Sequence, residues 1–170
     1  MDYLLHVIVV LAVYTILAVS YDLLAGHTGL LSVAHAAFYG VGAYTSAILV
    51  TDLRAPFLVG MLGGMMTAGV LSIVISLVSV RLREEFFVVA TFGFQMMVFS
   101  VLNNWTALTR GPLGIGGIPE PRICGLRVDS QWRFTVLSVC LACAVYVVVR
   151  RISVSPFGRV LHAMREDDGF

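Results

Sequence analysis

Apolar residues occur along the chain in five long runs separated by short polar segments. The runs cover residues 3–21, 23–51, 57–80, 86–102 and 134–149. A helix needs about 20 predominantly apolar residues to cross the hydrocarbon core of a bilayer. The pattern therefore predicts an all-α, polytopic membrane protein with about five transmembrane helices.

The second run, 23–51, is too long for one straight span and contains four glycines, namely Gly26, Gly29, Gly40 and Gly42. Glycine allows the backbone to leave helical geometry. In lipid, such a break is tolerated only where the freed N–H and C=O groups face protein or a water-filled path. We therefore expect an interrupted or re-entrant helix beside a passage.

Two predicted helices carry small residues at spacings that let helix backbones approach closely. One is the G-x-x-x-G pair Gly60 and Gly64. The other is a stripe at steps of four and three: Ala36, Gly40, Ala43 and Ala47. We expect the helix that carries this stripe to be central in the fold.

Three polar side chains within or at the ends of the apolar runs are candidates for a functional role. His35 is either a neutral imidazole hydrogen-bonded between helices or a group that lines a pathway. Asp22 is either a helix-end acid at the headgroups or a residue at the mouth of the passage. Gln95, in the middle of its span, needs an interhelical partner.

The C-terminal segment has the pattern of a short amphipathic helix. Ser155 and Pro156 are typical of the N-cap and the first helical residue. An apolar stripe follows, with Phe157, Val160, Leu161 and Met164 on one side and Arg159, His162, Arg165 and Glu166 on the other. A helix of roughly ten residues is marginal alone. We expect it to dock either in a groove of a partner protein or on the membrane surface.

Residues 103–133 lack the apolar character of a span. Seven glycines and prolines fall within 111–121, and Trp105 and Trp132 flank the segment as expected interface anchors. We assign 103–133 to an external loop and 150–170 to the cytoplasm.

The composition excludes several classes of function. The 170 residues are 59% apolar and 12% charged, and the mean hydropathy is +0.93. The net charge of +1 indicates no nucleic-acid partner. No phosphate-binding loop is present and no nucleophile, base and acid can be combined, so we expect no enzyme, no catalytic residue and no cofactor.

Cys140 and Cys143 lie in an apolar run, where we expect small buried residues and no metal site.

Three segments together resemble the LivM-type permeases of branched-chain amino-acid ABC importers. They read GHTGLLSVAHAAFYGVGAYTSAIL at 26–49, NWTALTRGPLGIGGIP at 104–119 and SPFGRVLHAMRED at 155–167. They follow one another in order over nearly the whole chain. Permeases of the related urea type share much of this pattern.

The resemblance implies a role for two sets of residues. A translocation path would include Asp22, Gly26, Thr28, Gly29, Ser32, His35, Gly40, Gly42 and Gln95. Coupling to an ATPase would involve Ser155, Pro156, Phe157, Gly158, Arg159, Leu161, Met164, Arg165 and Glu166.

The resemblance also implies an assembly in the bacterial inner membrane. Its partners would be a second permease subunit, identical or different, two ATP-binding subunits and a periplasmic or extracellular substrate-binding protein. Permeases of this family continue into further spans, so we expect residues 1–170 to form one membrane domain that is the N-terminal part of a longer protein. Two alternatives remain open: an ion-coupled carrier or channel in which Asp22 and His35 relay protons, and a truncated membrane fragment that does not transport.

Overall fold

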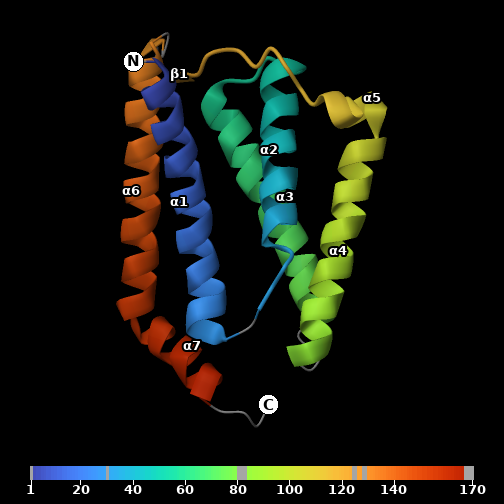
Figure 1. The fold of residues 1–170 in the computed structure, drawn as a ribbon, viewed down its shortest axis with the longest axis vertical. Coiled ribbons are helices and arrows are strands. Elements are labelled where there is room, and N and C mark those ends of the chain that lie inside the picture. Colours follow the sequence, from blue (N-terminus) through green and yellow to red (C-terminus); the bar gives the residue numbers. More distant parts are fainter. Residues whose placement is uncertain (1, 30, 80–83, 124–125, 128–129, 167–170) are drawn as a thin grey trace. The chain divides into compact units, whose positions relative to one another are not determined.

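A computed structural model describes residues 2–29, 31–79, 84–123, 126–127 and 130–166 (Figure 1). The chain forms two compact units. The first contains Met1–Leu31 and Val128–Phe170, and the second contains Ser32–Arg127. The chain passes from one unit to the other within the glycine-containing segment.

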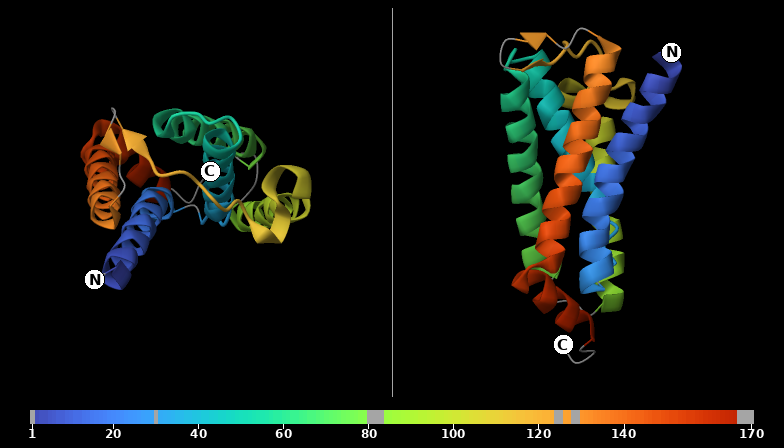
Figure 2. Two further views of the ribbon diagram at one scale, coloured as in Figure 1. Left: turned by 90° about the horizontal axis from the view of Figure 1, so that it is seen from above. Right: turned by 90° about the vertical axis from the view of Figure 1, so that its left-hand side faces the viewer.

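The first unit consists of three helices: α1 (Asp2–Thr28), α6 (Gln131–Val154) and α7 (Pro156–Glu166). In Figures 1 and 2, α1 and α6 run side by side in the same direction, and α7 turns away at the end of α6. Small buried residues, Ala12 on α1 and Thr135 on α6, lie in this unit. Cys140 and Cys143 are exposed on α6, so the expectation that they are buried was wrong. In a spanning helix such an apolar surface packs against lipid or against another helix.

The second unit contains three longer helices, α2 (His35–Thr51), α3 (Phe57–Ser79) and α4 (Glu84–Asn104). Short elements follow: α5 (Thr106–Thr109), the 3-10 helix η1 (Gly111–Leu113), and two antiparallel strands, β1 (Arg122–Ile123) and β2 (Leu126–Arg127). This part of the 103–133 segment contains no helix long enough to span a membrane.

Four helices among the described residues, α1, α3, α4 and α6, are long and apolar enough to cross a membrane. At about 1.5 Å per residue, the 17 residues of α2 reach only about 25 Å, slightly less than a typical hydrocarbon core. Most large apolar side chains on the spanning helices are exposed within the chain, as expected where lipid is the solvent. The prediction of an all-α polytopic membrane protein is confirmed.

Helix α1 is longer than the sequence pattern predicted. It continues through Asp22 and Gly26 and ends at Thr28, so the expected end of the first span at residue 21 was wrong. The helix ends where Gly29 adopts a φ of +76°, a left-handed conformation that glycine adopts without steric cost. Of the four glycines in 23–51, Gly29 is the one that breaks the helix. Gly26, Gly40 and Gly42 lie inside helices.

Helices α2 and α3 pack through glycine, as the G-x-x-x-G pair predicted. A Cβ atom at Gly64 would lie 2.6 Å from the carbonyl oxygen of Gly42, and one at Gly60 would lie 3.2 Å from that of Ser46. The Thr67 hydroxyl also donates to the Thr45 hydroxyl at 3.1 Å. These two backbones therefore touch without intervening side chains.

The face of α2 that meets α3 differs from the predicted stripe. The contact uses Gly42 and Ser46, whereas Ala36 and Ala43 are exposed and Gly40 lies against the side chain of Leu102 on α4. The spacing of small residues indicated that a close contact exists but did not select the correct face.

Candidate functional site

The break between α1 and α2 enters the second unit as a buried turn. Ser32 and Ala34 are buried, and the backbone N–H of Val33 donates to the hydroxyl oxygen of Thr91 on α4 at 3.2 Å. The Thr91 hydroxyl in turn donates to the carbonyl of Val88 at 3.0 Å. A backbone group freed by the break is thus satisfied inside the protein, as lipid requires.

One face of α4 continues from this turn along α2. Phe94 packs on Phe38, with ring centroids 6.2 Å apart, and Leu102 lies next to Gly40. Gln95 is one helical turn beyond Thr91. Its Oε1 atom is buried and accepts no hydrogen bond from any described residue. An unsatisfied buried carbonyl costs about 1–3 kcal/mol, so a donor from outside the described residues would stabilise this one.

The predicted path residues are divided between the two units. Ser32, His35, Gly40, Gly42 and Gln95 belong to the second unit, where His35 is the first residue of α2. Asp22, Gly26, Thr28 and Gly29 belong to the first. Asp22 lines a groove in that unit with His27. Gly40 lies against Leu102 of α4, and Gly42 lies in the contact with α3. Ser32 is buried in the turn before α2.

The predicted start of the C-terminal helix is confirmed. Ser155 is extended, with ψ 166°, and its hydroxyl oxygen accepts a hydrogen bond from the Gly158 N–H at 3.3 Å. Pro156 is the first residue of α7. Gly158 is buried against the end of α6, where a Cβ atom would lie 2.6 Å from the Ile152 carbonyl oxygen. A larger residue at 158 would not fit this corner.

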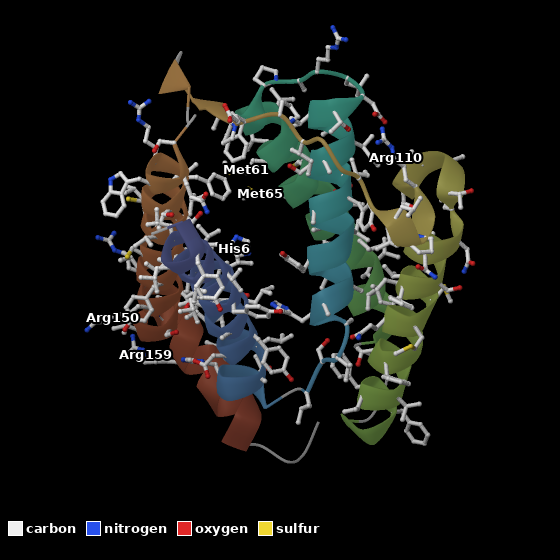
Figure 3. All side chains as sticks on the ribbon, turned by 45° about the horizontal axis from the view of Figure 1, so that its top comes forward. His6, Met61, Met65, Arg110, Arg150 and Arg159 are labelled. Carbon is white, nitrogen blue, oxygen red and sulfur yellow. The ribbon has the colours of Figure 1, made fainter. Side chains whose placement is uncertain are left out.

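The described part of α7 presents apolar side chains that are largely exposed. Phe157 is 63% exposed and Val160 is 58% exposed, while Leu161 is half-buried and Arg159 is exposed (Figure 3 labels Arg159). Met164, Arg165 and Glu166 continue the helix, but their side chains lie outside the described part of the structure.

Comparison with known proteins places this architecture in a family. The family model described as "Branched-chain amino acid transport system / permease component" matches residues 3–169. The chain belongs to this family. It is therefore a multi-pass membrane protein of a permease family, as its apolar helices indicate.

Two curated relatives resemble this permease. Both are named "High-affinity branched-chain amino acid transport system permease protein LivM", one from Salmonella typhimurium (strain LT2) and one from Escherichia coli (strain K12). Each is 28% identical to this chain over an alignment of 180 residues. The alignment covers 92% of this chain and 42% of the relative. The permease chain thus spans about two fifths of the length of these relatives. No solved structure matches it significantly.

Sequence reasoning missed Thr91 in this permease. Thr91 is almost fully buried and supports the turn between α1 and α2. Its spacing of four residues from Gln95 could have suggested a polar face on an otherwise apolar helix. A lone threonine in a span more often bonds to its own helix, however, so the pattern gave no specific signal.

Proposed function

We propose that this permease is the transmembrane subunit of an ABC importer for branched-chain or related amino acids in the bacterial inner membrane. The names of the two relatives support this substrate class. The partners would be a second permease subunit, two ATP-binding subunits and an extracytoplasmic substrate-binding protein. ATP would be hydrolysed on the ATP-binding subunits, and this chain would contribute the path and the mechanical connection.

The observation that carries the proposal is the exposed apolar face of α7. Phe157 and Val160 lie on a helix that is too short and too polar to span the membrane. An amphipathic helix held at a fixed angle by its cap can insert these residues into a groove of a partner. The buried Gly158 keeps α7 close to the end of α6, so movement of a docked partner would reach a spanning helix directly.

The α2–α4 side of the second unit is the proposed part of the translocation path. Gln95 offers an acceptor to a solute ammonium group or to water. The Thr91 hydroxyl, one helical turn before Gln95, accepts a hydrogen bond from the non-helical backbone at Val33, directly after the buried Ser32. At membrane depth, non-helical backbone occurs where it is covered by protein or lines a cavity.

Substitutions on α7 test the coupling. We expect Phe157→Asp or Arg159→Glu, in the permease reconstituted with its ATP-binding subunits, to abolish ATP-driven uptake while insertion and helix content remain normal. Asp at position 157 puts a charge into an apolar contact, and Glu at 159 reverses the charge at its rim. Uptake and ATP hydrolysis are measured in the same proteoliposomes.

Leu113→Asp is the control for association with the ATP-binding subunits, because Leu113 is 93% exposed but is not on α7. Full ATP-driven uptake by both α7 variants would contradict the proposal. Uptake driven by a proton gradient in liposomes without an ATP-binding subunit would identify an ion-coupled carrier instead.

A further inference from the structure

A groove of about 440 Å³ lies on the first unit between α1 and α6, and the proposed function assigns it no role. Four of its lining residues are polar and four are apolar or aromatic. The polar residues are Asp22, His27, Arg150 and Ser153, and the others are Ala18, Val19, Tyr146 and Val149.

The polar and the apolar residues of the groove are separated along the axes of α1 and α6. Because α1 and α6 run the same way (Figure 1), later residues on both helices lie toward the same end. Asp22 follows Val19 by three residues, and Arg150 and Ser153 follow Tyr146 by four and seven. The polar residues therefore lie nearer the helix ends, and Ala18, Val19 and Tyr146 lie about one turn before Asp22 and Arg150. A phospholipid has this same order, from headgroup to acyl chain, along a spanning helix.

The charged groups of the groove are available to a ligand. Neither Asp22 nor Arg150 (labelled in Figure 3) takes part in an ion pair with any described residue. Gly26 leaves space for the acid, since a Cβ atom there would lie 2.5 Å from an Asp22 carboxylate oxygen. His27 Nδ1 lies 3.4 Å from the Asp22 carbonyl oxygen and helps to hold this turn. One carboxylate and one guanidinium thus face a single groove.

We propose that this groove binds a phospholipid whose headgroup carries a primary ammonium, of the phosphatidylethanolamine class. The Arg150 guanidinium and the Ser153 hydroxyl donate to the phosphate, and the Asp22 carboxylate accepts from the ammonium. Val19, Tyr146 and Val149 contact the first part of an acyl chain. A free amino acid is also zwitterionic, but it has no long acyl chain to follow the apolar half of the groove.

The bound lipid would contact the corner that positions α7. Ser153 lines the groove, and its carbonyl oxygen is one of the atoms against which Gly158 packs. The lipid would therefore stabilise the end of α6 directly next to the start of α7. This inference goes beyond the proposed transport function and is tested by lipid binding, without a transport assay.

The test is native mass spectrometry of the permease in detergent with defined lipids. We expect phosphatidylethanolamine to remain bound in preference to phosphatidylcholine, whose trimethylated ammonium donates no hydrogen bond to Asp22. Arg150→Gln should weaken the binding of both lipids by roughly tenfold, since it removes a charge-assisted hydrogen bond to phosphate. Asp22→Asn should remove the preference for the primary amine while phosphate binding remains.

Arg151→Gln is the matched control, because Arg151 is the next residue on α6 and is exposed but does not line the groove. It should bind lipid as the unchanged protein does, and Arg150→Lys should keep most of the binding. Circular dichroism verifies the helix content of each variant. Equal losses at Arg150 and Arg151, equal binding of the two lipids, or displacement of the lipid by free leucine would each overturn the proposal.

Discussion

The α2–α3 contact and the corner between α6 and α7 each contain a glycine packed against a backbone carbonyl oxygen. They differ in whether the apolar side chains near the glycine are covered by the chain itself. Gly64 meets the carbonyl of Gly42, and both helices of that contact belong to the described chain. Gly158 meets the carbonyl of Ile152, and the next apolar residues, Phe157 and Val160, are left uncovered. Gly64 thus allows two helices of the chain to pack closely, whereas Gly158 sets the position of an exposed apolar helix face.

This difference separates two kinds of exposed apolar residue. On α3 and the other spanning helices, such residues are expected, because lipid or other spans cover them. On α7, with 11 residues and an exposed Arg159, a span is not possible, so the apolar residues need another surface. We therefore expect a substitution at Gly64 to lower the stability of the second unit, and a substitution at Gly158 to impair coupling to the ATP-binding subunits.

The largest effect is expected from Gly158→Ala. The added methyl group overlaps backbone carbonyl oxygens of Ile152 and Ser153, which cannot rotate away, so α7 must change its angle. We expect loss of most ATP-driven uptake with unchanged helix content. Gly93→Ala on α4, where a Cβ atom meets nothing within 4 Å, is the control. Normal uptake by the Gly158 variant would show that the angle of α7 is irrelevant.

Gly64→Ala should destabilise the second unit. Its methyl group would lie 2.6 Å from the Gly42 carbonyl oxygen, so the two helices must separate. Overpacking of this kind costs about 1–3 kcal/mol, and the better helix propensity of alanine offsets about 1 kcal/mol of it. Denaturant titration in micelles, followed by circular dichroism, measures the change.

Gly69→Ala on the same helix is the matched control for Gly64→Ala, because its Cβ atom meets nothing within 4 Å. It should leave stability unchanged or raise it slightly. The close contact between α2 and α3 would be refuted by equal effects of the two substitutions.

Thr109→Val should loosen the segment after α4 without affecting either glycine contact. The buried Thr109 hydroxyl interacts with the Leu102 carbonyl at 2.6 Å and accepts from the Gly111 N–H at 3.2 Å. Leaving these groups unpaired costs about 1–3 kcal/mol locally. Hydrogen exchange of the Gly111 amide should accelerate in this variant and stay slow in Thr109→Ser, which keeps the hydroxyl. Identical exchange in both variants would argue against the role of the hydroxyl.

The smallest effect is expected from Asp52→Asn. Asp52 and Arg110 form an ion pair at 3.8 Å, and both side chains are 55% exposed. Exposed pairs of this type contribute at most about 1 kcal/mol and are screened by salt. The stability difference from the unchanged protein should disappear in high salt. A large loss of stability that does not depend on salt would mean that this ion pair holds the second unit together, in place of the glycine contact between α2 and α3.

The sequence predicted those features that depend on local chemistry. Four of the five apolar runs identified helices long enough to span a membrane, whereas the run 23–51 did not. The Ser155–Pro156 pair identified the start of α7, and Gly60 and Gly64 identified a close contact. Each follows from the length of an apolar run or from the geometry of one helix turn.

Features that depend on tertiary packing were not predictable in the same way. Asp22 appeared to end the first span, but α1 continues to Thr28 because a single acid does not terminate a helix that is otherwise favourable. The choice of Gly42 over Gly40 for the contact with α3 is made by the orientation of the helices. Thr91 matters only because the turn at Val33 reaches it.

Photo-crosslinking from α7 tests the central claim most directly. A benzophenone amino acid replaces Val160 in the permease, co-expressed with its ATP-binding subunits, and light-induced adducts are identified by mass spectrometry. Leu113 carries the same probe as the control. The account predicts an adduct with an ATP-binding subunit from position 160 and not from 113. Adducts with lipid alone from position 160 would show that α7 lies on the membrane surface and would contradict the coupling role.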